Sequence, residues 1–294
     1  MYGKMDVRNL SFEKFRSLRN MNLSIQQRKH SLPDANPGCH YHDFYELVIV
    51  RSGSALHYMN SESLPIGSGN ILLVPPDTVH GFFNPNELYI YNLLFCQDVF
   101  DFFREDLSPM PEFQMLFQIQ PRSKSKQRAK VGLLSLPKDA LISAVNCAEQ
   151  IKTEMREQKA GTGVLVYGLF LSLLVHCLRN ASLPQGAEAG NYVGAVSKLL
   201  AMLDQHPEKD WDLASMAKLA GMSAANFRLH FLRLIGQPPC GYLLALRLKK
   251  AAEILRSESA SVSETAYRVG FHDSNYFSRQ FHKFFGRSPR EYRR

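Results

Sequence analysis

The chain has 294 residues, a formal net charge of +8, and five cysteines that stand singly without a Cys-x-x-Cys pair. The length allows two domains with cores of their own, while isolated cysteines argue against a disulfide framework or zinc ribbon and favour a reducing cytoplasm. The charge is concentrated from Asn191 onward, where 16 Lys and Arg stand against 9 Asp and Glu, so this third of the chain favours a polyanionic partner.

Short apolar runs separated by turn residues fill the segment from Ser24 to Phe95. β-branched and aromatic residues predict strands over 45–51, 53–58 and 70–74, with Asn, Ser, Gly and Pro between them. Several short strands at close spacing predict a small β-barrel or sandwich.

Residues 118–130 form a polar, basic stretch that we expect to be an exposed loop. The residues after it show helical periodicity. It predicts helices over 137–157 and 163–179, and the broad apolar faces of this hairpin are suited to contact with a second copy of the chain. The apolar run 164–178 is too short to cross a bilayer comfortably and contains His176, so we expect a buried helix there.

The same pattern occurs twice in the last hundred residues, over 213–239 and 262–289. An interdomain linker is predicted before it at 181–191, because the residues there are small and polar and include Pro and Gly. Each copy predicts a short helix, a glycine turn and a second helix with aromatic residues at i and i+4. Two helix-turn-helix units in one basic segment indicate DNA binding. The positions that match between the copies are Leu213 and Val262, Ala217 and Ala266, Gly221 and Gly270, Phe227 and Phe277, Phe231 and Phe281, Gly236 and Gly286, and Pro239 and Pro289.

The second copy resembles the signature of the AraC/XylS family of bacterial transcription regulators. The positions that carry this resemblance are Ala266, Gly270, Phe271, Asn275, Tyr276, Phe277, Ser278, Arg279, Gln280, Phe281, Gly286, Ser288, Pro289 and Arg290. The resemblance implies an α+β protein with a cupin-like β-barrel and helical hairpin over 1–180, and an all-α double helix-turn-helix domain over 192–294. It implies a cytoplasmic, dimeric transcription activator rather than an enzyme.

Helical periodicity selects the side chains expected to face DNA. In the helix over 273–285, the stripe predicted to enter the core is Phe277, Phe281 and Phe284. Arg279 can bind guanine or a phosphate, and Asn275 can bind adenine, although either can also be an idle solvated side chain. The full set of predicted DNA-facing residues is Ala225, Asn226, Arg228, Leu229, Ser274, Asn275, Ser278, Arg279 and His282.

Two acidic residues stand out in this cationic segment. Asp273 occupies a position expected of a helix N-cap. Glu264 is expected to point outward, where it would suit a basic patch on RNA polymerase, or to act as a cap or solvated side chain.

A second group of residues lies in the N-terminal part of the chain. The spacing of His40, His42, Glu46 and Gly53, followed by the segment from Gly69 to Asn84, resembles both cupin motifs, with Asp77 where the second motif usually has glycine. In metal-binding cupins the matching positions, here His40, His42, Glu46 and His80, hold a divalent ion such as Zn, Ni, Fe or Mn. Three interpretations stay open: a metal site, a polar ligand pocket without metal, and structural histidines.

The segments over 42–60 and 271–281 are similar to the rhamnose-responsive regulators within the family, which suggests a sugar effector. The residues predicted to bind it are Arg28, His40, His42, Glu46, His57, Tyr58 and His80. The competing functions are a metal-dependent cupin enzyme or metal-responsive regulator, and an architectural DNA-binding protein without effector control. The helix-turn-helix pair argues against the enzyme, because a catalytic barrel has no use for a basic DNA-binding segment.

Overall fold

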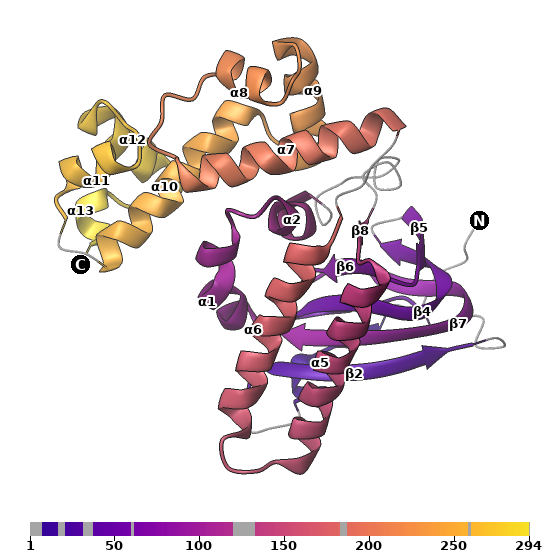
Figure 1. Ribbon diagram of the computed structural model, residues 1–294. Helices are drawn as coiled ribbons and strands as arrows, with labels where there is room; N and C mark the ends of the chain where they lie inside the picture. The colour runs from indigo at the N-terminus through magenta and orange to yellow at the C-terminus, as the bar shows by residue number, and fades with distance from the viewer. Residues whose placement is uncertain are drawn as a thin grey trace. The chain divides into compact units, whose positions relative to one another are not determined.

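A computed structural model (Figure 1) describes residues 8–16, 21–31, 38–59, 62–119, 133–182, 187–257 and 260–293. The chain separates into two compact units, unit 1 up to Ser197 and unit 2 from Lys198. Unit 1 combines a β-sheet with helices and unit 2 is helical in its described residues. This architecture confirms the expected α+β fold with a cupin-like β domain and an all-α domain.

Two long antiparallel strands organise the sheet of unit 1. Strand β4 pairs with β7 from Tyr45 opposite Phe95 to Met59 opposite His80. The order of strands is β1-β3-β7-β4-β6-β8, with β2 paired to β7 and β5 paired to β4. The strands are β1 (Arg8–Leu10), β2 (Leu23–His30), β3 (His40–His42), β4 (Tyr45–Met59), β5 (Glu62–Gly67), β6 (Asn70–Val74), β7 (His80–Phe95) and β8 (Leu134–Ser135).

The strands predicted over 45–51 and 53–58 are two halves of β4. The register shifts between Val50 and Leu56 mark bulges, which bend a strand without ending it. Gly53 lies at this bend with a φ of 74°, and a Cβ there would lie 2.1 Å from the backbone oxygen of Glu87. The turn signal in the sequence was therefore a bend within one strand.

Successive side chains along each strand point to opposite faces of the sheet, and both faces are buried. The inner face holds an apolar core of Val48, Val50, Ala55, Met59, Ile66, Leu72, Val74, Phe82, Leu88 and Ile90. On the outer face the ring of Phe95 contacts Phe103 and Phe170, with centroids 5.9 and 5.3 Å apart. Because both faces of β4 and β7 are covered, their central segments are apolar with few polar interruptions.

Helices cover the outer face of the sheet (Figure 1). The predicted hairpin is present as α5 (Lys138–Glu157) and α6 (Thr162–Asn180). Four further helical elements were not predicted from the sequence: α1 (Gln97–Leu107), α2 (Pro111–Gln114), the π-helical turn η2 (Met115–Ile119) and the 3-10 turn η1 (Phe12–Lys14). Most of the basic stretch over 118–130, expected to be a loop, lies outside the described residues.

By length and composition, α6 is the one described helix that could cross a membrane. Its inward face is buried in unit 1, where Val166, Phe170 and Leu174 are fully inaccessible. Cys147 of α5 donates a hydrogen bond from Sγ to the backbone oxygen of Leu169, 3.4 Å away. The packing agrees with the predicted buried helix.

The helices after residue 182 are α7 (Ala187–Gln205), α8 (Leu213–Leu219), α9 (Ala224–Ile235), α10 (Pro239–Ser257), α11 (Val262–Arg268), α12 (Ser274–Phe285) and α13 (Pro289–Tyr292). They confirm the repeated helix-turn-helix, as α8 with α9 and α11 with α12. The aromatic pairs Phe227 with Phe231 and Phe277 with Phe281 are fully buried, and the ring centroids lie 5.5 Å apart in both pairs.

The segment 181–191, expected to be a linker, is partly helical. Helix α7 begins at Ala187, ahead of the predicted start at Tyr192. Alanine and glutamate at 187–189 are strong helix formers, and the linker prediction gave more weight to the small polar composition around them.

We expect Phe170→Ala to lower the free energy of unfolding by about 3–5 kcal/mol, because it removes a fully buried ring between α6 and the sheet. The measurement is urea denaturation of the full chain. Phe102→Ala is the matched control, because Phe102 of α1 is 75% exposed and its truncation should cost at most about 0.5 kcal/mol. Equal losses in the two variants would contradict the packing described for α6.

Candidate effector pocket and DNA-binding helices

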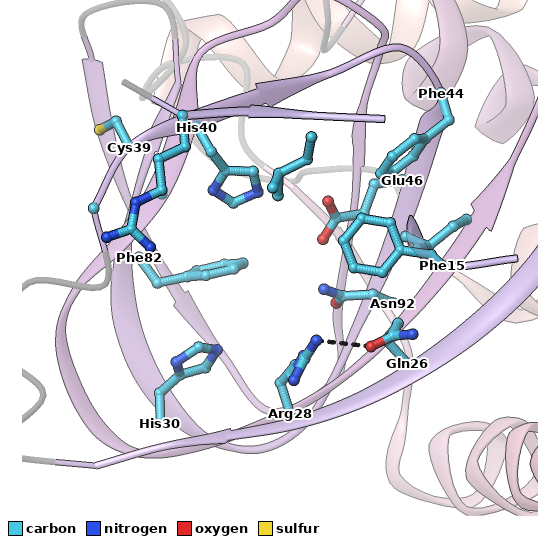
Figure 2. A pocket seen from close by; sticks show the side chains of 15 residues that line it. Phe15, Gln26, Arg28, His30, Cys39, His40, Phe44, Glu46, Phe82 and Asn92 are labelled. Atoms are coloured by element: carbon cyan, nitrogen blue, oxygen red, sulfur yellow. Dashed lines mark hydrogen bonds between the residues drawn. The ribbon is translucent and has the colours of Figure 1, made fainter. Parts of the chain in front are cut away.

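A cavity of about 430 Å³ opens on the inner side of the sheet in unit 1 (Figure 2). This volume is in the range of small-molecule sites in proteins, about 300–1,000 Å³. Its lining combines aromatic rings with a few polar side chains. The lining residues are Arg8, Leu10, Phe15, Gln26, Arg28, His30, Gly38, Cys39, His40, Phe44, Glu46, Gly81, Phe82, Asn92 and Leu94.

Polar groups from separate strands converge on this cavity. Arg28 and Gln26 lie on the same face of β2, and the Arg28 guanidinium donates a hydrogen bond to Gln26 Oε1 at 2.8 Å. Figure 2 shows these side chains with Asn92, Glu46 and His40 around a common space. Asn92 Oδ1 is buried and has no hydrogen-bond partner among the described residues, so it is an acceptor available to a ligand.

The structure divides the seven predicted effector residues into three groups. Arg28, His40 and Glu46 line the cavity directly. His42, His57 and His80 are fully buried without being part of the lining. Tyr58 alternates with His57 on β4, contacts the ring of Phe83 edge-on, and is absent from the cavity wall.

The histidines surround the carboxylate of Glu46. Glu46 Oε2 lies 3.2 Å from His42 Nε2 and 3.5 Å from His80 Nε2. His80 Nδ1 lies 3.5 Å from His57 Nε2, and the rings of His40 and His80 have centroids 4.3 Å apart. Ligand atoms of His40, Glu46 and His80 all lie within 4.8 Å of one another, so these three residues have donor types and spacing that fit a metal ion. The fourth predicted metal ligand, His42, contacts Glu46 but is not part of that group.

Burial is the main influence on the titration of His40. Removal from water lowers its pKa below the ordinary value, and the opposing attraction of Glu46 is smaller. A neutral imidazole at the cavity wall can accept a hydrogen bond or bind a metal ion.

Asp77 explains how the second cupin motif tolerates a residue other than glycine. Its backbone has a φ of 59°, in the left-handed region that glycine usually occupies. Aspartate adopts this conformation more readily than most residues. Its backbone N–H donates to the carbonyl oxygen of His42 at 2.8 Å, which holds β3 against this turn.

Sequence reasoning missed Gln26, His30 and Asn92 as cavity residues. The signal was present, because Gln26, Arg28 and His30 alternate along β2 and therefore share one face. The individual strands predicted from the sequence begin at Tyr45, which leaves the alternation along β2 outside the prediction.

The predicted DNA-facing residues lie mainly on exposed helix surfaces. Ala225, Asn226, Arg228 and Leu229 of α9 are all exposed, and Leu229 retains 44% of its surface. On α12, Asn275, Arg279 and His282 are exposed, while Ser274 and Ser278 are half-buried. The hydroxyl of Ser278 donates to the backbone oxygen of Ser274 at 2.8 Å, so it is already engaged within its helix.

The predicted core stripe of α12 is wrong at one position. Phe284 is 45% exposed, and the residue that continues the stripe is Phe285. The ring of Phe285 lies 4.6 Å from that of Phe281 and 5.0 Å from that of Tyr292, measured between centroids. The i+4 spacing continues at the end of the helix because α13 packs there, which leaves Phe284 on the outside.

The two acidic residues have clear structural roles. Asp273 Oδ1 accepts hydrogen bonds from the backbone N–H groups of Asn275 and Tyr276, at 2.7 and 3.0 Å, which confirms the predicted N-cap. These bonds hold the pKa of Asp273 below its usual value. Glu264 forms a reciprocal capping box with Ser261 at the start of α11, and its side chain is otherwise exposed.

Each part of the chain matches a known protein family. Residues 30–156 match the AraC-like ligand binding domain, and residues 216–294 match a helix-turn-helix domain. The chain is 31% identical to the HTH-type transcriptional activator RhaS of Escherichia coli, over 93% of this chain and 92% of that protein. It is 26% identical to the HTH-type transcriptional activator RhaR of Mannheimia succiniciproducens, over 98% of this chain and 97% of that protein.

A solved structure, the C-terminal domain of the response regulator yesN from Fusobacterium nucleatum, is 27% identical and covers 34% of this chain and 98% of its own, with a TM-score of 0.33. Together, the ligand-binding domain, the helix-turn-helix domain and the near full-length relatives assign the protein: it belongs to the AraC family of DNA-binding transcription regulators.

Proposed function

We propose that this protein activates transcription in response to a sugar bound in the cavity of unit 1. The observation that supports this most directly is the convergence of Arg28, His40, Glu46 and Asn92 on one cavity of the chain that carries the helix-turn-helix pair. The relatives named as transcriptional activators support activation over repression.

The chemistry of the cavity suits a polyhydroxylated ligand. Sugar hydroxyls both donate and accept, and the wall offers the acceptors Glu46 and Asn92 beside the donor Arg28. Phe15, Phe44 and Phe82 add apolar surface for the carbon–hydrogen faces of a sugar ring. The combination favours a compact neutral polyol over a flat hydrophobic ligand.

In unit 2, α9 and α12 are the helices that we propose enter the major groove. Each presents an exposed arginine, Arg228 or Arg279, on the surface opposite its buried phenylalanines. The connecting helix α10 has 19 residues and is therefore about 28 Å long. This length approaches one turn of DNA, about 34 Å, and suits two successive groove segments on one face.

Two further partners stay predictions. A homodimer would form through the hairpin of α5 and α6, on which Ile142, Val164 and Leu165 are exposed apolar residues. Contact with RNA polymerase would use Glu264, which keeps an exposed carboxylate while it caps α11.

We expect one monosaccharide of a panel to raise the melting temperature of the full chain by about 5–10 °C at a concentration near 100 times its Kd. Arg28→Met should remove most of that shift, because it deletes the cationic donor of the cavity. Lys29→Met is the matched control, because Lys29 is adjacent on β2 and pairs with Glu87 at the surface. A panel without any shift, or a full shift in Arg28→Met, would contradict the proposed pocket.

We expect Arg279→Ala to weaken binding to a cognate DNA site by about 1–3 kcal/mol, because an exposed arginine on α12 can form bidentate contacts with guanine. The measurement is a fluorescence anisotropy titration at fixed salt. Arg179→Ala, an exposed arginine at the end of α6, should leave the affinity unchanged. Wild-type affinity in Arg279→Ala would remove this residue from the DNA interface.

A further inference from the structure

Glu46 is a buried carboxylate without a Lys or Arg beside it among the described residues. Glu46 is 3% exposed, and its ion-pair partners among the described residues are the imidazoles of His42 and His80. A buried carboxylate without a compensating positive charge costs several kcal/mol. A divalent cation bound beside Glu46 would supply that compensating charge.

The hydrogen bond of His42 determines which of its ring nitrogens faces Glu46. His42 Nδ1 lies 2.7 Å from the carbonyl oxygen of Phe44, which can only accept, so Nδ1 carries the hydrogen. In a neutral ring, Nε2 is then a lone pair, and it faces Glu46 Oε2 at 3.2 Å. This nitrogen is fully buried and has no hydrogen-bond partner among the described residues. A metal ion bound beside Glu46 would offset the repulsion between these two acceptor atoms.

Three strands supply the atoms that can bind a metal. His40 of β3 lies directly opposite His80 of β7 in the sheet, and Glu46 comes from β4. Two imidazoles and one carboxylate form a donor set that suits divalent iron, cobalt, nickel or zinc. Because His40 and Glu46 also line the cavity, one side of this group faces the space proposed for the effector.

We propose that His40, Glu46 and His80 bind one divalent transition-metal ion at the wall of the effector cavity, with an open coordination side toward the cavity. His42 acts as a positioning residue for Glu46. His57 acts as a positioning residue for His80, whose Nδ1 it approaches at 3.5 Å. Such outer contacts are the usual means by which a metal-binding histidine is oriented.

The metal also has a role toward the ligand, which rests on the proposed function. Neighbouring hydroxyl groups of a polyol can occupy the open side of a divalent ion as a pair. Arg28 and Asn92 lie on the same cavity wall, from β2 and β7, to bind the remaining hydroxyls. Sugars with adjacent hydroxyls in a suitable orientation would then be selected by the ion, and the cavity would discriminate among them.

The experiment uses the full chain, stripped with EDTA and titrated with Co²⁺ alone. Binding is followed by calorimetry and by the visible absorption of the bound Co²⁺. The variants are Glu46→Gln, which preserves the shape of the side chain, and His40→Ala, which alters a half-buried residue at the cavity wall. His206→Ala is the matched control, because His206 forms an exposed pair with Glu208 outside unit 1. Circular dichroism and melting without metal check that each variant is folded.

We expect about one Co²⁺ per chain, a weakening of about tenfold or more in both Glu46→Gln and His40→Ala, and no change in His206→Ala. Less than about a tenth of an ion per chain at saturating Co²⁺ would overturn the metal site. Unchanged affinity in both folded barrel variants would overturn it as well, because the ion would then be bound elsewhere.

The experiments distinguish a failure of the proposed metal site from a failure of the proposed sugar effector. A sugar-induced melting shift that is unchanged after EDTA would overturn the role of the metal in effector binding and leave the proposed regulator intact. Stoichiometric Co²⁺ binding without a response to any sugar of the panel would support the metal site and contradict the sugar effector.

Discussion

The pairing of β4 with β7 is the constraint on which unit 1 depends. Every other strand except β1 and β8 pairs with one of these two, and the bulges between Val50 and Leu56 curve the pair. Curvature creates an inner face and an outer face with different chemistry. The inner face carries the apolar core together with Glu46 and His80, while the outer face carries Phe95 under the helices. One ladder of hydrogen bonds thus positions both the cavity and the layer of helices behind it.

A buried charge within this apolar framework has a physical consequence for regulation. Glu46 is almost completely buried, and the low dielectric constant of such surroundings strengthens the electrostatic interactions of its side chain. A ligand that contacts Glu46 or His40 would therefore interact with these side chains where solvent screening is weak. On the opposite face of the same sheet, Gln27 and Tyr91 hydrogen-bond to Glu149 of α5. Adjacent residues of β2 thus contact the cavity on one face and the helical hairpin on the other, which gives a short physical route between them.

Unit 2 shows how a repeated sequence pattern produces two similar surfaces. Buried phenylalanines at i and i+4 fix the orientation of α9 and α12, and this orientation leaves Arg228 and Arg279 exposed. Gly270 has a φ of 91°, and a Cβ there would lie 2.8 Å from the guanidinium of Arg247 and from the backbone oxygen of Pro207. Gly270 is therefore required by the close packing of its turn. The matching Gly221 has no atom within 4 Å of such a Cβ, and its positive φ of 67° alone favours glycine there.

The fold class, the helix-turn-helix pair and the family are predictable from the order of the amino acids, because they depend on local periodicity and on short motifs. Buried aromatic residues at i and i+4, turn glycines and helix caps such as Asp273 act within a few residues, so their pattern is readable along the chain. Local periodicity is insufficient at Phe284, because the packing of α13 places Phe285 in the core instead.

Which of the histidines share a site depends on the three-dimensional fold. His40, Glu46 and His80 come from three strands, and their proximity depends on strand register and on the curvature of β4. The same register turns Tyr58 outward and brings Gln26 and Asn92 into the cavity. A shift of one residue would reverse every side chain on a strand, and the register is set by long-range pairing between segments distant in sequence.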